Sequence, residues 1–135
     1  MAANTVIYDT DPGVDDAMAL LFLHFSPQVE LAGITTVMGN AAIEITTRNA
    51  LYLKQRFGIG APVARGAGKP LSGIMPKAPA HIHGHNGLGD VAIPETIAAQ
   101  PDPRPAHQFI IDSVRARPHE ISIVAVGRMT NLALA

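Results

Sequence analysis

The sequence predicts an open, mainly parallel α/β sheet with helices on both faces. Short β-prone segments alternate with helical ones along the chain, and the β-prone segments show little alternation of polar and apolar residues. Alternating strands and helices are typical of βαβ units, and strands without polar alternation have both faces covered. Hydrophobic residues make up 47% of the 135 residues, which suffices for the core of one domain.

The first strands and the helix between them come from the N-terminal third. Residues 5–8 (TVIY) form a short β-prone run. Residues 15–25 (DDAMALLFLHF) are apolar on nearly all sides, which predicts a buried helix. Residues 30–37 (ELAGITTV) have the character of a second strand with both faces covered.

The middle of the chain contains a second helix, a short strand and a long irregular segment. Residues 43–57 are predicted to form the helix, which Gly58 ends in a left-handed cap. Residues 61–64 indicate a brief third strand. Residues 66–103 contain six glycines and six prolines and no clear periodicity. A loop of that length inside a domain is usually functional.

The C-terminal segment adds a helix, a strand and the start of another helix. Pro105 suits the first turn of a helix. The apolar stripe of that helix comprises Ala106, Phe109, Ile110, Ser113 and Val114. Residues 121–126 (ISIVAV) form the clearest strand, and Thr130 is expected to be the N-cap of a helix that begins at residues 131–135.

The composition excludes several functional classes. Ten basic and eleven acidic residues give a net charge of −1, so there is no basic excess to hold a nucleic acid. The absence of cysteine excludes a disulfide scaffold, a thiolate zinc site and a cysteine nucleophile. The longest apolar run, residues 17–23, is far shorter than the roughly 20 residues of a membrane span. We therefore expect a cytoplasmic protein with neither a membrane nor a nucleic acid as partner.

An acidic cluster follows the first predicted strand. Four of the seven aspartates of the chain lie within eight residues: Asp9, Asp11, Asp15 and Asp16. Open α/β sheets bind ligands at the carboxyl ends of their strands. Carboxylates packed closely repel one another, and a hard divalent cation such as calcium or magnesium offsets that repulsion. The alternative is that these residues only form a turn and cap the helix.

The long irregular segment contains a second group of possible metal ligands. His81, His83 and His85 alternate in the sequence HIHGHN, and an extended backbone would place all three on one side. Such a set could hold zinc or nickel, which is the basis of an alternative metallohydrolase hypothesis. The other interpretation is a flexible, solvated loop.

Several motifs occur in an order that resembles a known family. The pattern DTDPGVDDAMAL begins at Asp9, Gly39 and Asn40 follow the second strand, and IHG and GLG occur at residues 82–84 and 87–89. The sequence VGRMTNLALA occupies residues 126–135. Together they resemble the inosine-uridine preferring nucleoside hydrolases, or N-ribohydrolases. The resemblance covers the whole chain but only the N-terminal portion of that family's domain.

The resemblance implies an activity and a cofactor. It implies calcium-dependent hydrolysis of the N-glycosidic bond of ribonucleosides to free base and ribose, in purine or pyrimidine salvage. Asp11 would bind calcium and act as the general base for water. Asp16 and the backbone carbonyl of Thr130 would be further calcium ligands. A ribosyl cation-like transition state, as in glycoside hydrolysis, suits a site rich in carboxylates.

The resemblance also implies which residues contact the substrate. Asp15 would accept hydrogen bonds from the ribose hydroxyls, Asn40 would orient the sugar or the water, and His83 would lie near the nucleobase. Asp9 would support the calcium ligands without binding the calcium ion itself. Arg128, by contrast, is expected to be a surface charge.

An alternative function follows from residues that the family places in its C-terminal half. The family completes its calcium site with a further aspartate and assists the leaving base with groups that lie outside residues 1–135. The alternative is a catalytically incomplete fragment that acts through self-association or through a complementary chain. Exposed apolar surface on such a fragment would favour a homo-oligomer.

Overall fold

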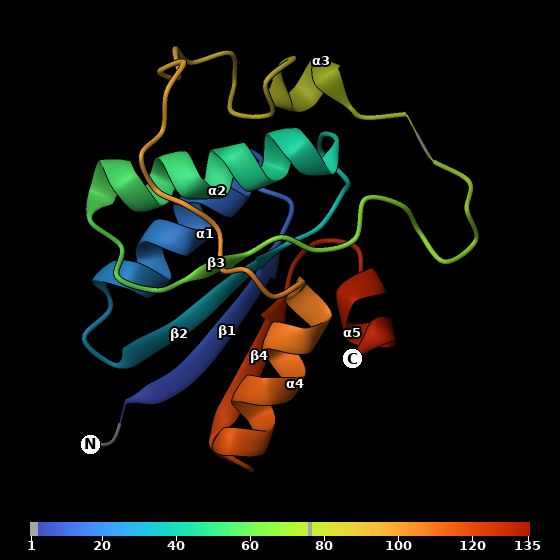
Figure 1. Cartoon of the computed structure of the whole chain (residues 1–135). Helices are drawn as coiled ribbons and strands as arrows, with labels where there is room; N and C mark the ends of the chain where they lie inside the picture. The colour runs from blue at the N-terminus through green and yellow to red at the C-terminus, as the bar shows by residue number, and fades with distance from the viewer. Residues whose placement is uncertain (1–2, 76) are drawn as a thin grey trace.

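The strands and helices follow one another in the predicted order. The computed structural model describes residues 3–75 and 77–135, and Figure 1 shows its elements in chain order. The elements are β1 (Asn4–Thr10), α1 (Val14–Phe25), β2 (Val29–Thr36), α2 (Ile43–Phe57), β3 (Val63–Ala64), α3 (Ala80–His83), α4 (Ala106–Ala116), β4 (Ile121–Ala125) and α5 (Thr130–Leu134).

The sheet is parallel throughout and has β1 near its centre. Within the described residues the strand order is β3-β2-β1-β4, and each neighbouring pair is parallel. The chain moves outward from β1 to β3 and then crosses back to place β4 on the other side of β1. This reversal makes the carboxyl ends of β1 and β4 the position where open α/β sheets bind ligands.

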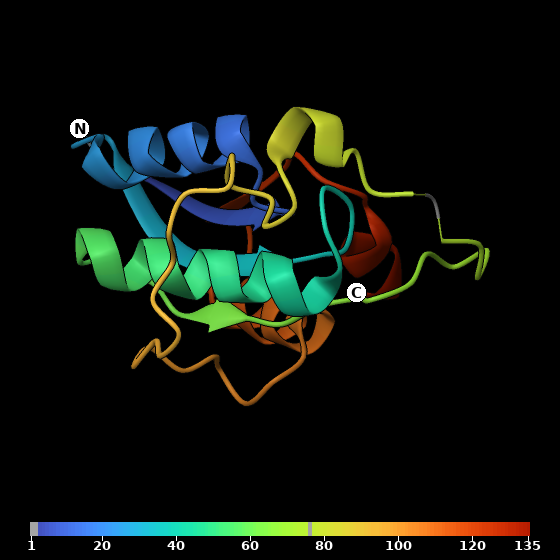
Figure 2. The ribbon, with the colours of Figure 1, turned by 90° about the horizontal axis from the view of Figure 1, so that it is seen from above.

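Helices cover both faces of the sheet, which confirms the predicted fold class. Successive side chains of β1 point to opposite faces of the sheet. Tyr8 belongs to the cluster formed with α1 and α2, whereas Ile7 packs with Phe109 and Ile110 of α4. Figure 2 shows α1 and α2 side by side over the first face. Leu132 of α5 packs at the margin of the second cluster.

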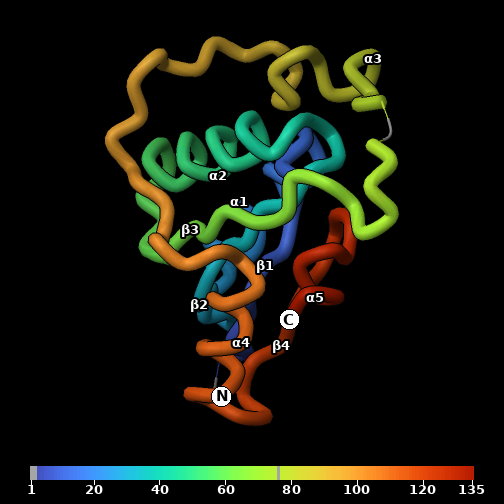
Figure 3. The backbone as a smooth tube through the Cα atoms, turned by 45° about the vertical axis from the view of Figure 1, so that its right-hand side comes forward, coloured from blue at the N-terminus to red at the C-terminus, as the bar shows by residue number. Residues whose placement is uncertain are grey.

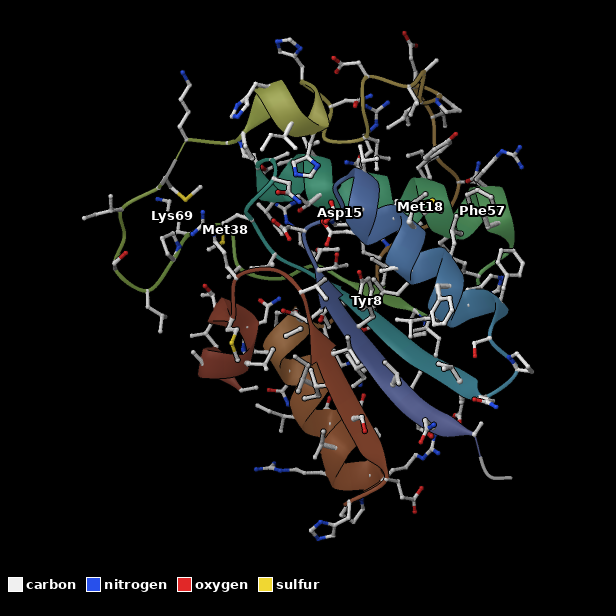
Figure 4. The ribbon with its side chains drawn as sticks, turned by 180° about the vertical axis from the view of Figure 1, so that it is seen from behind. Tyr8, Asp15, Met18, Met38, Phe57 and Lys69 are labelled. Carbon is white, nitrogen blue, oxygen red and sulfur yellow. The ribbon has the colours of Figure 1, made fainter. Side chains whose placement is uncertain are left out.

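The prediction that α1 is buried is wrong. Only Asp16 and Leu20 of this helix are buried. Its outward face carries four apolar side chains that are 47–74% exposed, namely Val14, Met18, Phe22 and Phe25. Their spacing of three or four residues keeps them on one side of the helix, and Figure 4 shows Met18 on this helix. A helix packed on a sheet buries one stripe, so an apolar sequence alone does not establish burial on every side.

Two local differences concern the last helix and the long loop. Met129, not Thr130, is the N-cap residue of α5, and Thr130 is the first helical residue. The segment 66–103 contains the short helix α3, which the sequence did not indicate. No helix in residues 3–75 and 77–135 has the combination of length and hydrophobicity required to cross a membrane.

Gly33 allows α4 to approach the sheet. The register between β1 and β2 shifts so that Val6 pairs with Leu31 and Ile7 pairs with Gly33, which is the pattern of a β-bulge. A Cβ atom at Gly33 would overlap the ring of Phe109. The bare backbone therefore forms part of the packing surface for this ring.

We expect Gly33→Ala to lower the free energy of unfolding by about 1–3 kcal/mol, because the Phe109 ring has to move in a packed core. Gly60→Ala is the matched control, since a Cβ atom there meets nothing within 4 Å. It should be neutral or stabilising by up to about 1 kcal/mol. Urea denaturation of both variants measures the difference. Equal stability of Gly33→Ala and the wild type would contradict this account.

Candidate active site

A pocket opens at the carboxyl ends of β1 and β4. Its volume is about 300 Å³. Four segments contribute to it: the β1–α1 turn with the first turn of α1, the β2–α2 loop, α3 with the preceding residue, and the turn after β4. The lining residues are Asp11, Asp15, Asp16, Gly39, Asn40, Pro79, His83, Val126, Gly127 and Arg128. The structure therefore brings together five of the six site residues predicted from sequence. The sixth, Thr130, is buried at the start of α5 and does not line the pocket.

The turn after β1 fixes the position of Asp16. Gly13 is the N-cap residue of α1, and its N–H donates to Asp16 Oδ2 over 2.9 Å. The amide Nδ2 of Asn40 donates to the same oxygen over 2.8 Å. This carboxylate satisfies a free N–H at the beginning of the helix. Asp15 lies on the outer side of the same turn, where its side chain is 83% exposed.

Asp11 is held by Asn40 and by two close glycines. The backbone N–H of Asn40 donates to Asp11 Oδ2 over 2.7 Å, and its side-chain Nδ2 donates to the Asp11 carbonyl oxygen over 3.0 Å. A Cβ atom at Gly39 would collide with Oδ2, and one at Gly127 would lie 2.6 Å from Oδ1. Larger residues at either position would displace the carboxylate, so these glycines are part of the site.

Burial raises the free-energy cost of ionising the carboxylates of this cluster. Burial, together with the neighbouring charge of Asp16, raises the pKa of Asp11 to about 6. Burial, together with the charge of Asp15, raises the pKa of Asp16. Burial likewise raises the pKa of Asp9, although Asn131 and Thr35 donate hydrogen bonds to it. The protein thus maintains closely spaced acids in positions where their negative charge is poorly solvated.

The donor set suits a hard cation. Among the described residues, the hydrogen bonds that Asp11 and Asp16 receive from other residues fall on Oδ2, which leaves Oδ1 of each carboxylate free. Free carboxylate oxygens are ligands that calcium and magnesium prefer. Within residues 3–75 and 77–135, no three acidic or histidine side chains converge closely enough to hold a metal ion without other ligands.

The histidines do not form the set expected from their alternation. His81 and His83 lie within α3, so the backbone there is helical and not extended. His83 is buried and lines the pocket, and its Nδ1 accepts the Val14 N–H over 3.3 Å. His85 is 91% exposed and contacts Asp90 instead. A short helix at this point separates the three rings, which removes the geometric basis of the alternative zinc or nickel site.

The sequence did not single out the lining residues that follow β4. The pocket is lined by Val126, Gly127 and Arg128, and Arg128, expected to be a surface charge or a contact of neighbouring loops, is exposed at its edge. Arg128 is exposed, and its charge lowers the pKa of Asp11 against the larger effect of burial. Their position directly after the strand neighbouring β1 could have identified them, because carboxyl ends of parallel strands meet at one edge.

We expect Asp11→Asn to stabilise the cation-free protein above pH 6. The pKa of Asp11 is raised from 3.8 to about 6 in the fold. Between these pH values Asp11 ionises in the unfolded chain but stays protonated in the fold, so the free energy of unfolding falls as the pH rises. Asparagine cannot ionise. The stability difference between variant and wild type should therefore grow from near pH 4 and level off above pH 6, at a value on the order of 3 kcal/mol.

Urea denaturation in the presence of a chelator, repeated from pH 4 to pH 8, measures this difference. Asp9 and Asp16 are present in both proteins, so the comparison reports the loss of the Asp11 charge together with the loss of its repulsion of Asp16. A stability difference that does not change with pH would show that Asp11 is not perturbed by burial.

The sequence and the fold were compared with known proteins. The family model described as inosine-uridine preferring nucleoside hydrolase matches residues 6–135. Uridine nucleosidase 1 of Arabidopsis thaliana is 44% identical over 131 residues, which are 96% of this chain and 39% of that protein. The inosine-uridine preferring nucleoside hydrolase of Leishmania major is 43% identical over 132 residues, which are 96% of this chain and 42% of that protein.

Solved structures agree with the sequence comparison. The plant nucleoside hydrolase PpNRh1 superimposes with a TM-score of 0.90 at 39% identity, covering 96% of this chain and 41% of that one. The purine-preferring ribonucleoside hydrolase of Gardnerella vaginalis gives a TM-score of 0.90 at 37% identity, with coverage of 97% and 42%. The chain thus spans about two fifths of the length of these relatives. It belongs to the inosine-uridine preferring nucleoside hydrolase family.

Proposed function

We propose that the pocket hydrolyses the N-glycosidic bond of ribonucleosides to ribose and free base. The observation that carries this proposal is the convergence of Asp11, Asp15 and Asp16 on one pocket at the carboxyl end of β1. Relatives of the chain include proteins named as uridine nucleosidase and as inosine-uridine preferring nucleoside hydrolase. Cleavage of the bond develops positive charge on the ribosyl group, which nearby carboxylates stabilise.

In the proposed reaction, Asp11 accepts the proton of the attacking water. In the cation-free protein burial raises the pKa of this carboxylate to about 6, so it is ionised at neutral pH and able to accept a proton. The Asn40 N–H donates to Oδ2 of this carboxylate, and the Asn40 side chain donates to the Asp11 backbone carbonyl oxygen, so both parts of the residue are held. The free Oδ1 is the atom available to the water.

The substrate contacts are assigned to the outer part of the pocket. Asp15 is exposed there and accepts hydrogen bonds from the ribose hydroxyls. His83 Nδ1 lies 3.9 Å from Asp15 Oδ1, and this proximity supports the proposal that the imidazole lies near the nucleobase of the same substrate. Asn40, half-buried between Asp11 and Asp16, orients the sugar or the water.

We further propose calcium as the cofactor, held by Asp11, Asp16 and the backbone carbonyl of Thr130. The support is the pair of free carboxylate oxygens and the repulsion between these two acids. When bound, a divalent cation lowers the pKa of a coordinated water and fixes hydroxyl groups of the substrate. Thr130 follows the pocket-lining turn after β4, so its position depends on that turn.

We expect calcium-dependent release of ribose from inosine or uridine. Asp11→Ala should lower the rate by about 100-fold or more, because it removes the general base. Glu120→Ala is the control, since this exposed carboxylate does not line the pocket and bonds to Arg117. A reducing-sugar assay with calcium and with chelator measures the rates. Activity that persists in Asp11→Ala would contradict the assigned role of Asp11.

A second candidate function is a subunit or fragment that associates with another chain, either a second copy or a complementary one. Two observations favour it. The outward face of α1 carries the exposed apolar residues Val14, Met18, Phe22 and Phe25. Within the described residues, β4 is paired on one side only. Exposed apolar patches and free strand edges are surfaces through which chains associate.

Light scattering tests this second candidate. If the outward face of α1 mediates self-association, the wild type will exceed the 14.2 kDa of one chain, and Phe22→Asp will return it to that mass. Ile74→Asp introduces the same charge at an apolar side chain that is 78% exposed on a loop, and it should leave the mass unchanged. A wild type that is monomeric at high concentration would argue against a homo-oligomer.

A further inference from the structure

Two buried asparagines lie behind the pocket without lining it. Asn49 on α2 is fully buried, and Asn131 on α5 is 1% exposed. The side-chain amide of each connects segments that are distant in sequence. Burying an amide in a core costs free energy unless its hydrogen bonds are made, so the partners of each amide indicate what it holds in place.

Asn131 joins the ends of the strands beneath Asp11. Its Nδ2 donates to Asp9 Oδ1 over 2.8 Å and to the Thr36 carbonyl oxygen over 2.9 Å, and its Oδ1 accepts the Ala67 N–H over 2.9 Å. Asp9 belongs to β1, Thr36 belongs to β2, and Ala67 lies in the segment after β3. Figure 3 shows that last segment passing beside α5. Asn131 thereby fastens the start of α5, where Thr130 lies, to β1, the strand that precedes Asp11.

Asn49 joins the acidic turn to the loop that carries His83. Its Nδ2 donates to the Pro12 carbonyl oxygen over 3.2 Å and to the Asn86 carbonyl oxygen over 2.8 Å. Its Oδ1 is buried without a partner within the described residues. Both amide hydrogens are therefore used, at the cost of an unpaired acceptor. Gly87 allows this close approach, because a Cβ atom there would lie 3.0 Å from Asn49 Nδ2.

The anchored loop holds His83 in one orientation. The Gly89 N–H donates to the His83 carbonyl oxygen over 2.7 Å, and Asp90 Oδ1 accepts the N–H groups of His85 and Asn86. The loop is thus closed on itself, and fixing Asn86 fixes His83. A backbone N–H can only donate, so the bond from Val14 makes His83 Nδ1 an acceptor and leaves Nε2 as the donor of the neutral ring.

We propose that these two asparagines are positioning residues with separate tasks. Asn131 sets the cation end of the pocket by holding the start of α5, which contains Thr130, to the strand end before Asp11. Asn49 sets the substrate end by holding His83 to the acidic turn. The inference rests on the proposed function for the identity of the two ends. The supporting contacts are distinct, since the two amides share no partner.

The test compares Asn131→Leu with Asn49→Leu, because leucine keeps the approximate volume and removes both donors. Terbium reports the cation end. Tyr8 donates to the Asp16 carbonyl oxygen over 3.1 Å, so this tyrosine can sensitise the luminescence of a terbium ion bound at the neighbouring carboxylates. Pseudouridine with saturating calcium reports the substrate end by calorimetry, because its carbon–carbon glycosidic bond is not hydrolysed.

We expect Asn131→Leu to weaken terbium binding about tenfold or more, as loss of a group that orients metal ligands does. Its affinity for pseudouridine at saturating calcium should stay within about twofold of wild type. Asn49→Leu should show the reverse, with pseudouridine affinity reduced about tenfold and terbium affinity unchanged. Asn49→Ser and Asn131→Ser, which keep one hydroxyl donor, replace the leucine variants if those do not fold.

Thr5→Val is the control for loss of a buried hydrogen bond elsewhere. Thr5 is 4% exposed at the opposite end of β1, where it bonds to Glu30 and Arg117. It should destabilise the fold without changing either affinity. If both asparagine variants lose both affinities alike, or if neither affinity changes, the separation of tasks is wrong.

Hydrogen exchange distinguishes failure of this inference from failure of the proposed function. A wild type that binds neither terbium nor pseudouridine would contradict the proposed function. The inference still requires Asn49→Leu to lose amide protection at residues 13–14 and 84–91, and Asn131→Leu to lose it at residues 64–67 and 126–131. Loss of protection in both regions by either variant would overturn it.

Discussion

The site depends on a balance between the burial of Asp11 and the groups that keep its carboxylate in place. Burial opposes its ionisation and raises its pKa to about 6, yet the carboxylate does not turn away into solvent. The Asn40 backbone N–H holds one oxygen, and Gly39 and Gly127 leave the space that the carboxylate occupies, because a Cβ atom at either position would overlap it. A poorly solvated carboxylate held this firmly is a preorganised acceptor for a cation or a proton. The free energy that burial costs its negative charge is recovered when either one binds.

Much of the fold could be predicted from the sequence because its signals are local. The helix over residues 43–57 and the left-handed Gly58 that ends it follow from periodicity and from the freedom of glycine, and the structure confirms both. The burial of α1 could not be predicted in the same way. It depends on which neighbours cover the helix, and the outward side chains of Met18 and Phe22 are apolar yet exposed.

The site was partly predictable for a related reason. Asp11, Asp15 and Asp16 are close in sequence, so their clustering was evident before the fold was known. Asn49 and Asn131 were not recognised, because an isolated asparagine in a helix carries no local signal and its importance arises from partners up to 122 residues away. The alternation of the histidines was misleading, since α3 replaces the extended backbone that the interpretation required.

The place of β1 in the sheet has a consequence for the order in which the chain acquires its structure. β1 pairs with β2, where Thr5 is matched with Glu30, and also with β4, where Thr5 is matched with Ile121. During synthesis at 5–20 residues per second, one edge of the central strand waits on the order of ten seconds for its partner. Contacts of such long sequence separation also slow folding. The acidic turn is synthesised early, but the wall contributed by Val126 to Arg128 follows only after β4, so the pocket cannot close until more than a hundred residues after its first carboxylates have been made.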